Sequence, residues 1–550
     1  MIVNPRSERF YSMTKKRRFT KVISIILLAA IYLQGCEFPA ATVDSLPEAS
    51  DPPATESPEL DASVPDSPKP GLFRVRYVPD SPVNPITSLA GDNLVLASLL
   101  YEGLFTLDSN LNVEPVLCES WSTEDNITYT YLIKSGIAMT DGSTLTADDV
   151  VYTLKQAMQT GLFINRLSVI RSVESDEELT VTVVLKTPNS HLNMLLDIPI
   201  IKDGTIDYSI PPGTGPYEFS GAGDMRLRRF IRYRDFAKLP ITNIYLLICD
   251  DHEIAEAFDD GKLSLLRDDP ASTIDVILNR HSEIRLYDTT TLQYIGYNMR
   301  SIVLRNADVR RAIGSSLDRR YIADTIMHGQ PVASPLALSP SYRLYDAQWE
   351  DVVTDPLKGM SALLIRAGLK DYDNDSYLEY PDGYDSYYKF ALDFIVNSDN
   401  PYKVEAAHRI SDTLKLYGFE IIVRELPWDS FIASLEAGTF DLYYGEITLG
   451  ADFDLSPLLL PDSHLNYGLM GGEYYRSYIE NFLAAPTDED ELVAAQLLCD
   501  EINEDAPFIP ILYKRYVVYT PIGAISGATP SQSGIFNNFS DWTIDLEMLP

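Results

Sequence analysis

Strand-like and helix-like segments alternate along this chain from residue 72 to its end, and this alternation restricts its fold more than any other feature. Apolar alternation or short apolar runs indicate strands at 73–77, 128–133, 179–185, 390–397 and 420–426. Helical patterns lie at 94–105, 147–158 and 402–416, after Asn306 and before Gly368. Elements that alternate in this way build α/β lobes around sheets, and the chain has no solenoid repeat.

The chain is strongly acidic. Its 550 residues include 80 Asp and Glu against 44 Lys and Arg, which gives a net charge of −36. A surface of this sign repels phosphate backbones, so we expect no nucleic-acid partner. At roughly 100–200 residues per domain, the length predicts two or three domains.

The first 36 residues are typical of a secretion signal. Residues 1–21 carry seven basic side chains and one acidic one, and residues 22–33 are almost purely apolar. Leu33-Gln34-Gly35-Cys36 follows and resembles the lipobox of bacterial lipoproteins. We therefore predict a signal peptide at 1–35 and a lipid anchor on Cys36, at the outer face of the cytoplasmic membrane. A single membrane-spanning anchor and a soluble secreted protein are the alternatives.

Residues 36–70 are predicted to form a tether. The stretch 37–70 contains eight Pro, eight acidic residues and one Lys. Because proline fixes φ and like charges repel, this stretch should be extended and disordered. Such a tether would hold a globular body away from a membrane surface.

A series of short sequence blocks runs in one order through the rest of the chain. One of them is Asp141-Gly142-x-x-Leu145-Thr146-Ala147-Asp148-Asp149-Val150-Val151-Tyr152. The others lie at 115–121, 128–133, 213–217, 297–298, 309–319, 426–431, 438–441 and 507–511. Each block is weak alone, but in this order they resemble family 5 of the extracellular solute-binding proteins, the oligopeptide and dipeptide receptors of ABC importers.

The resemblance implies an α/β fold, a two-lobed clamp like the periplasmic binding proteins (type II, cluster C) with three domains. Domain I would be discontinuous, at 71–102, 213–297 and 518–550. Domain II would span 103–212 in the same lobe, and domain III would span 298–517 in the other lobe. Two crossing strands would join the lobes, and a ligand that contacts both lobes would shift the population toward the closed form.

The resemblance also implies a function. The chain would be a monomeric receptor that captures a small peptide and delivers it to ABC permease subunits, with no cofactor. Alternatives are the same fold binding a metal chelate, haem or a sugar, and a surface sensor or adhesin with a degenerate cleft. We expect no enzyme, because the six His are scattered and no G-x-S-x-G, HExxH or P-loop motif is present.

Several residues match positions that bind ligand in this family. There, an acidic residue in an Ala-Asp-aromatic segment takes the terminal ammonium of the peptide, and Ala451-Asp452-Phe453 matches that segment. The resemblance thus implies Asp452 as the ammonium ligand, with Asp454 as the fallback; a solvated loop acid is the alternative. It implies pocket positions for Tyr294 and Trp428, for which core packing is an equal alternative.

The segment before Asp452 departs from the family pattern. Peptide-binding members usually carry a Trp just before the Ala-Asp step, and oligopeptide receptors often an Arg a little earlier, whereas this chain has Leu449-Gly450. No basic residue lies between Phe440 and Asp454. A site with Glu446 and Asp452 and no local Arg should prefer a cationic ligand, or one without a recognised carboxylate.

One acidic loop has the ligand spacing of an EF-hand. Oxygens fall at positions 1, 3, 5, 9 and 12, from Asp371, Asp373, Asp375, Glu379 and Asp382. However, Ser376 replaces the glycine of the sharp turn, and position 12 is a short Asp rather than Glu. We therefore expect an acidic surface turn and no metal, with a Ca²⁺ site as the alternative.

Overall fold

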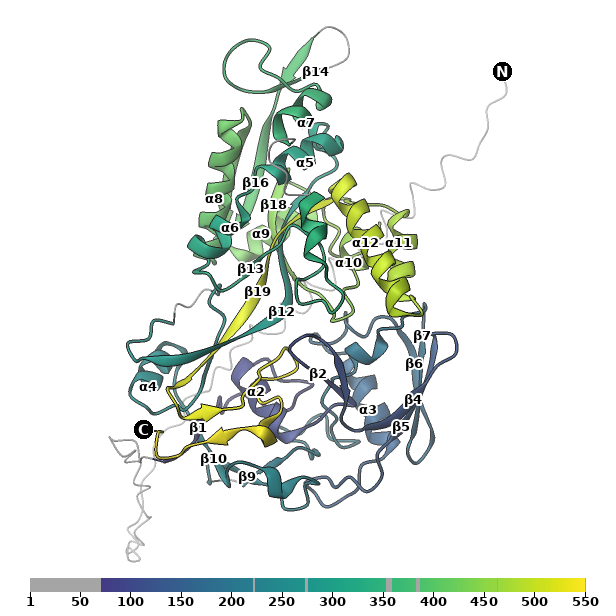
Figure 1. Cartoon of the computed structure of the whole chain (residues 1–550), viewed down its shortest axis with the longest axis vertical. Coiled ribbons are helices and arrows are strands. Elements are labelled where there is room, and N and C mark those ends of the chain that lie inside the picture. The colour runs from purple at the N-terminus through teal and green to yellow at the C-terminus, as the bar shows by residue number, and fades with distance from the viewer. Residues whose placement is uncertain are drawn as a thin grey trace, which may run out of the picture. The chain divides into compact units, whose positions relative to one another are not determined.

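The computed structural model describes residues 71–549, except for 221–222, 273–275, 353–358, 382–385 and 462 (Figure 1). These residues belong to one unit that covers 66–550. The predicted signal peptide, Cys36 and the whole predicted tether therefore lie outside the described residues, as does Asp382.

A four-stranded sheet with the order β1-β10-β9-β8 draws its strands from two separate parts of the chain. Its strands are β1 (Arg74–Arg76), β8 (Tyr217–Phe219), β9 (Arg226–Arg229) and β10 (Asn243–Leu247). The Gly213-Thr214-Gly215 turn packs on the end of helix α2 (Gly91–Leu100), where a Cβ on Gly215 would lie 2.4 Å from the Leu100 carbonyl carbon. Glycine is required there because the two backbones approach so closely.

A second four-stranded sheet, β4-β5-β7-β6, lies entirely within residues 103–212. Its strands are β4 (Cys118–Ser122), β5 (Thr128–Ile133), β6 (Ile170–Glu177) and β7 (Thr180–Leu185), and a hairpin of β2 (Phe105–Leu107) and β3 (Val113–Pro115) precedes them. Thr146 and Asp149 form a reciprocal capping box at the start of α3 (Ala147–Ala157), so the predicted cap is confirmed. The helix predicted at 94–105 ends earlier than expected, at Leu100. The chain becomes extended at Tyr101 and enters β2 at Phe105.

The largest sheet has the order β11-β19-β12-β18-β16-β17, and β13 (Val332–Ala333) pairs with β19. Its strands are β11 (Leu266–Asp268), β12 (Ser282–Tyr297), β16 (Ala391–Asn397), β17 (Glu420–Leu426), β18 (Leu442–Thr448) and β19 (Phe508–Pro521). The long strands β12 and β19 are antiparallel partners from Ser282–Pro521 to Gly296–Phe508, and Figure 1 shows them as a teal and a yellow ribbon side by side. β12 ends at the last residue of this part of predicted domain I, and β19 runs from predicted domain III back into predicted domain I.

Helices surround this sheet. The longer ones are α5 (Ala307–Ser315), α7 (Met360–Ala367), α8 (Pro401–Leu416), α9 (Trp428–Ala437), α11 (Tyr475–Leu483) and α12 (Asp488–Asp505). The shorter elements are α4 (Ile254–Asp259), α6 (Arg319–Tyr321), α10 (Ser456–Leu459), β14 (Glu379–Pro381), β15 (Tyr387–Lys389), β20 (Ile525–Ser526) and β21 (Thr543–Ile544).

The predicted helix stop at Gly368 is confirmed, since this residue has a φ of +77° directly after α7. Within the described part of the chain, no helix combines the length and apolar character needed to cross a bilayer.

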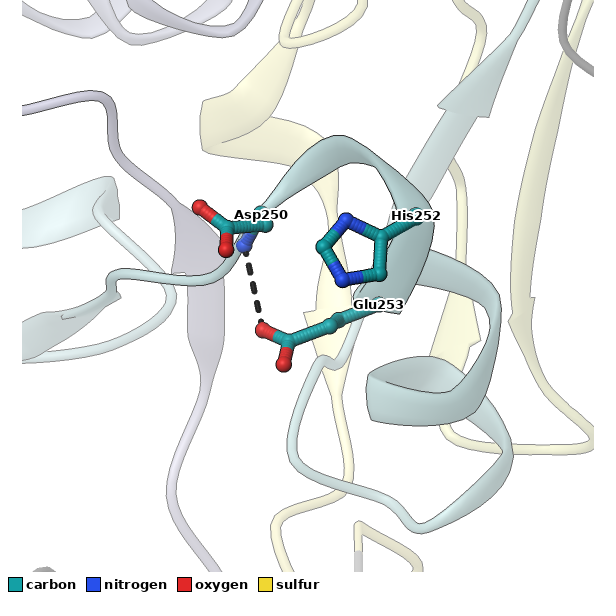
Figure 2. A group of neighbouring side chains, drawn as sticks. All are labelled: Asp250, His252 and Glu253. Carbon is teal, nitrogen blue, oxygen red and sulfur yellow. Dashed lines mark hydrogen bonds between the residues drawn. The ribbon is translucent and has the colours of Figure 1, made fainter.

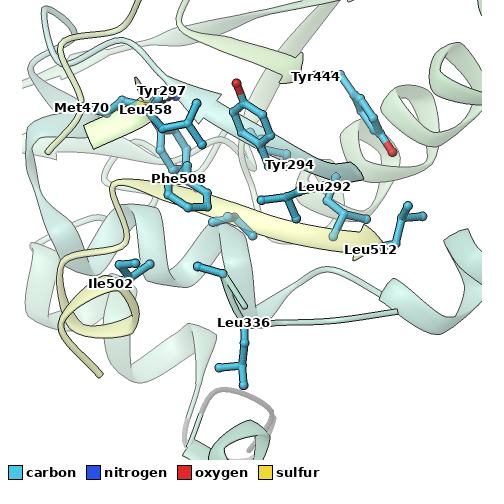
Figure 3. Close-up of a cluster of buried hydrophobic side chains, with 14 of the residues drawn as sticks. Leu292, Tyr294, Tyr297, Leu336, Tyr444, Leu458, Met470, Ile502, Phe508 and Leu512 are labelled. Carbon is cyan, nitrogen blue, oxygen red and sulfur yellow. Dashed lines mark hydrogen bonds between the residues drawn. The ribbon is translucent and has the colours of Figure 1, made fainter. Parts of the chain in front are cut away.

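The core beneath the large sheet contains two reciprocal pairs of tyrosine and glycine. Tyr294 of β12 is opposite Gly445 of β18, and Gly296 of β12 is opposite Tyr443 of β18. A Cβ on Gly445 would lie 2.5 Å from the Tyr294 ring, and one on Gly296 would lie 2.2 Å from the Tyr443 ring. Each ring therefore covers the glycine of the neighbouring strand. Figure 3 shows Tyr294 inside this buried cluster.

Candidate functional site

A hollow of about 440 Å³ lies where three distant parts of the chain meet. Its lining residues fall between 162 and 169 and between 446 and 465, together with Gln532. These parts belong to predicted domains II, III and I. A larger hollow of about 820 Å³ is lined only by residues between 311 and 510, inside one predicted domain. A ligand that draws two lobes together must contact both, so the smaller hollow is the candidate site.

Three of the predicted ligand residues line this hollow. Glu446, Asp452 and Asp454 are all on its wall. Tyr294 and Trp428 are not among the described residues that line it. Tyr294 is only 4 % exposed and covers Gly445 in the core. Trp428 begins α9, is 54 % exposed and stacks on Phe431 with ring centroids 6.2 Å apart.

Asp452 lies in a loop that follows β18, and its carboxylate is bound by Asn189 and lies close to Gly450. Its Oδ2 accepts a hydrogen bond of 3.0 Å from Nδ2 of Asn189, a residue of predicted domain II. A Cβ on Gly450 would lie 2.3 Å from Asp452 Oδ1. Glycine at position 450 therefore makes room for the carboxylate, which gives a physical reason for the departure from the family's usual Trp.

Asp452 and Asp454 form a pair of carboxylates with no ion-pair partner among the described residues. Burial, together with the charge of Asp452, raises the pKa of Asp454 to about 6. Asp454 Oδ1 accepts a hydrogen bond of 2.8 Å from the Ser456 backbone N–H, which holds it at the start of α10. The pair therefore gains from any cation that enters the hollow.

Glu446, by contrast, already has cationic partners. Lys403 Nζ lies 3.0 Å from its Oε2, and Lys514 Nζ lies 3.7 Å from its Oε1. Gln293 Nε2 donates a further hydrogen bond of 2.9 Å to Oε2. Desolvation opposes ionisation of this carboxyl, but the two lysines and the Gln293 hydrogen bond together outweigh it and keep the pKa of Glu446 below its ordinary value. Glu446 is thus neutralised by protein groups before any ligand binds.

Arg166 is a wall residue that the sequence analysis missed. It comes from the segment between α3 and β6, makes an ion pair with Asp197 and donates a hydrogen bond of 3.3 Å to the Met194 carbonyl. Burial lowers its pKa to about 10, against the opposing effect of Asp452, so it stays charged at neutral pH. Nothing in the local sequence pattern links this segment to 446–454. The expectation of a site without a nearby Arg is based on the residues just before Asp452, and it does not describe the folded site.

The loop after β7 also reaches predicted domain III, beside the hollow. The Ser190 backbone N–H donates to the Leu483 carbonyl at 2.7 Å. His191 Nε2 lies 3.1 Å from Glu491 Oε2, and both side chains are less than 10 % exposed. Together with Asn189, these contacts join the segments assigned to predicted domains II and III at the edge of the site.

Gln532 is the lining residue that comes from predicted domain I, and it is held by Thr290. Its amide oxygen accepts from the Thr290 backbone N–H at 2.8 Å, and its amide nitrogen donates to the Thr290 hydroxyl at 3.0 Å. The Thr290 hydroxyl in turn donates to the Leu449 carbonyl at 2.7 Å. This chain of hydrogen bonds positions the backbone that leads into Asp452.

The comparison with known families decides the identity. The model of the bacterial extracellular solute-binding proteins, family 5 middle region, matches residues 112–464, which is well over half of the chain. The chain belongs to family 5 of the extracellular solute-binding proteins. The predicted resemblance is therefore confirmed, and with it an extracytoplasmic solute-binding protein of the ABC importer class.

Curated relatives of this family 5 protein cover most of its length. It is 23 % identical to the oligopeptide-binding protein AppA of Bacillus subtilis (strain 168) over 460 residues, which are 78 % of this chain and 80 % of AppA. It is 23 % identical to the glutathione-binding protein GsiB of Escherichia coli (strain K12) over 462 residues, which are 78 % of this chain and 86 % of GsiB. Both relatives are named for binding a solute and not for catalysis.

Solved structures support the predicted fold class. The structure of AppA from Bacillus subtilis in complex with a nonapeptide matches with a TM-score of 0.62 and 20 % identity, over 87 % of this chain and 100 % of that chain. NikZ from Campylobacter jejuni in complex with Ni(L-His) matches with a TM-score of 0.62 and 18 % identity, over 86 % of this chain and 99 % of that chain. The protein therefore has the α/β two-lobed clamp fold of the family 5 binding proteins.

Proposed function

We propose that this protein is a lipid-anchored, monomeric receptor that captures a small peptide through its free amino group and delivers it to an ABC permease. One observation carries the proposal. The hollow shared by the three predicted domains contains Asp452 and Asp454, and neither makes a direct ion pair among the described residues, although Arg166 on the same wall feels the charge of Asp452.

The electrostatics of the pair favour an amine as the binding group. Two carboxylates that share a partly buried site repel each other, and this repulsion is relieved when an ammonium group binds between them. A charge-assisted hydrogen bond of this kind contributes on the order of 1.5–3 kcal/mol. Asp452 is the better first contact, since it is 5 % exposed and already fixed by Asn189.

The size of the hollow favours a small ligand. Sites for small molecules have volumes of roughly 300–1,000 Å³, and the hollow of about 440 Å³ is near the lower end. The names of the relatives support a peptide, because AppA is an oligopeptide-binding protein and its matched structure holds a nonapeptide.

The proposal includes a preference for cationic peptides, or for peptides without a recognised carboxylate. Because Lys403 and Lys514 neutralise Glu446, this preference depends on Asp452 and Asp454. Arg166 on the same wall reduces the preference without removing it, since its charge is shared with Asp197.

A ligand screen by thermal shift tests the capture of peptides. A ligand at 100 times its Kd stabilises the folded protein by about 2.7 kcal/mol. We expect di- and tripeptides with a free amino group to raise the Tm, basic ones the most, and their N-acetylated forms to raise it less. A Tm shift with Ni²⁺ and histidine but with no peptide would replace the proposal by a metal-chelate receptor, and a flat response to all ligands would favour a sensor or adhesin.

The lipid anchor is tested separately at Cys36. We expect the chain to fractionate with membranes and Cys36→Ser to move it to the soluble fraction, because the thiol that would carry the lipid is lost. Cys249→Ser is the matched control and should stay with the membranes. If Cys36→Ser also stays there, the anchor is a membrane span and not a lipid.

A further inference from the structure

The loop between α7 and β14 brings four carboxylates together in space. They belong to Asp371, Asp373, Asp375 and Glu379, and one oxygen of each lies within 4.8 Å of the others. We call this group the carboxylate loop. These are the first four acidic positions of the EF-hand-like spacing in the sequence. The structure also brings their side chains close together.

The serine that occupies the glycine position of an EF-hand loop does not prevent the sharp turn. Ser376, in place of the usual glycine, has a φ of +78°, in the left-handed region that glycine normally supplies. Its backbone N–H donates to Asp371 Oδ2 at 2.9 Å, and that of Asp375 donates to Asp371 Oδ1 at 3.1 Å. The sharp turn that a calcium loop needs is therefore formed with serine.

Glu379 supplies the observation that points to a ligand. Its side chain is completely buried, and its Oε1 has no hydrogen-bond partner among the described residues. The other oxygen, Oε2, accepts from the Tyr372 backbone N–H at 2.7 Å, which holds the carboxylate in the group. A buried acceptor without a partner destabilises the fold, and a bound cation would remove that cost.

Lys389 is the one protein cation paired with this group in the described structure. It lies on β15 opposite Glu379, its Nζ is 2.8 Å from Asp373 Oδ2, and it also pairs with Asp375. One ammonium balances one of four negative charges and leaves Glu379 Oε1 unpaired. Because the Lys389 side chain is 54 % exposed, it can move into solvent.

We infer that the carboxylate loop binds Ca²⁺ and that the ion displaces the ammonium of Lys389. Ca²⁺ takes six to eight oxygen ligands in flexible geometry, whereas Mg²⁺ requires a near-ideal octahedron. Four carboxylates on a turn, with room for water on the exposed side, suit the larger ion. None of the four lines the hollow around Asp452, so the site is separate from solute capture.

The test titrates CaCl2 into the chelator-treated full chain and follows heat and Tm, with NaCl of equal ionic strength as the blank. We expect one site per chain with a Kd of roughly 10⁻⁴–10⁻³ M, as in extracellular calcium modules. Glu379→Gln should weaken binding at least tenfold. Lys389→Gln should strengthen binding several-fold, because the competing ammonium is removed. This second variant keeps the test decisive if Glu379→Gln fails to fold.

The control is the other group of possible metal ligands in the described chain, Asp250, His252 and Glu253 (Figure 2). All three are exposed, and Glu253 Oε2 already accepts from the Asp250 backbone N–H at 3.2 Å, as the dashed line in Figure 2 shows. Glu253→Gln should leave Ca²⁺ binding unchanged. The inference is overturned by no Ca²⁺ response, by an equal response to MgCl2, or by equal losses in Glu379→Gln and Glu253→Gln. These measurements use the metal alone, so they are independent of any peptide.

Discussion

Replacing Asp452 with Asn is expected to weaken the binding of a free-amine peptide by roughly tenfold to a hundredfold. The substitution keeps the shape of the side chain and an oxygen that accepts from Asn189, but it removes the charge that pairs with the ligand ammonium. The lost charge-assisted hydrogen bond is worth about 1.5–3 kcal/mol. Isothermal titration with the library peptide that gives the largest Tm shift measures the effect.

An N-acetylated form of the same peptide makes this test specific. Acetylation should weaken binding to the wild-type protein but have little further effect on Asp452→Asn, because both changes remove the same ion pair. Asp412→Asn is the matched control, since the Asp412 side chain is 72 % exposed on α8. If acetylation and Asp452→Asn reduce affinity independently and additively, Asp452 does not bind the amino group.

The same pair gives the wild-type protein a characteristic pH dependence. The pKa of Asp454 is raised to about 6 in the ligand-free protein, so below pH 6 this carboxyl is protonated and attracts a cation less. Affinity for the free-amine peptide should therefore rise with pH through about 6 and fall again above about 8, where the amino group of the peptide loses its proton. The other charged or titratable residues that line the hollow with Asp454 are Arg166, Glu446, Asp452 and His464. In Asp452→Asn the rise should move to lower pH, since the neighbouring charge that raises the pKa is gone.

Much of the fold follows from local sequence signals. The α8 helix with its flanking strands β16 and β17, predicted at 402–416, 390–397 and 420–426, appears within about a residue of those limits. Helix caps and glycine stops also act through neighbouring residues, which is why Thr146, Asn306 and Gly368 could be interpreted from the sequence.

The site is harder to predict because its walls come from distant parts of the chain. Asp452 and Asp454 share one loop, so the family pattern in that loop is enough to propose both, and both line the hollow. Arg166 lines the same hollow and Asn189 donates a hydrogen bond to Asp452, both from segments more than 250 residues away, and no local periodicity marks such a contact. A prediction of ligand charge made from the 440–454 segment alone therefore omits the Arg166 cation.

Replacing Gly445 with Ala is expected to destabilise the protein by about 2–3 kcal/mol, as overpacking of a buried core does. The new Cβ would lie 2.5 Å from the Tyr294 ring, which also packs edge-on against Phe508 with centroids 5.6 Å apart and so has no free space to enter. For a domain of roughly 200 residues this lowers the Tm by about 4–12 °C. Gly161→Ala is the control, because no atom lies within 4 Å of its added Cβ, and it should leave the Tm unchanged.

Tyr294→Phe then separates a packing role from a ligand-binding role for this tyrosine. It keeps the ring over Gly445 and removes only the hydroxyl, which lies 3.3 Å from the Tyr443 hydroxyl. If the ring serves the core, Tyr294→Phe binds peptide as the wild type does, while Gly445→Ala lowers the Tm. A tenfold loss of peptide affinity in Tyr294→Phe with an unchanged Tm would instead mean that the hydroxyl reaches the ligand. The reciprocal Tyr443–Gly296 pair predicts the same Tm loss for Gly296→Ala, because its Cβ would lie 2.2 Å from the Tyr443 ring.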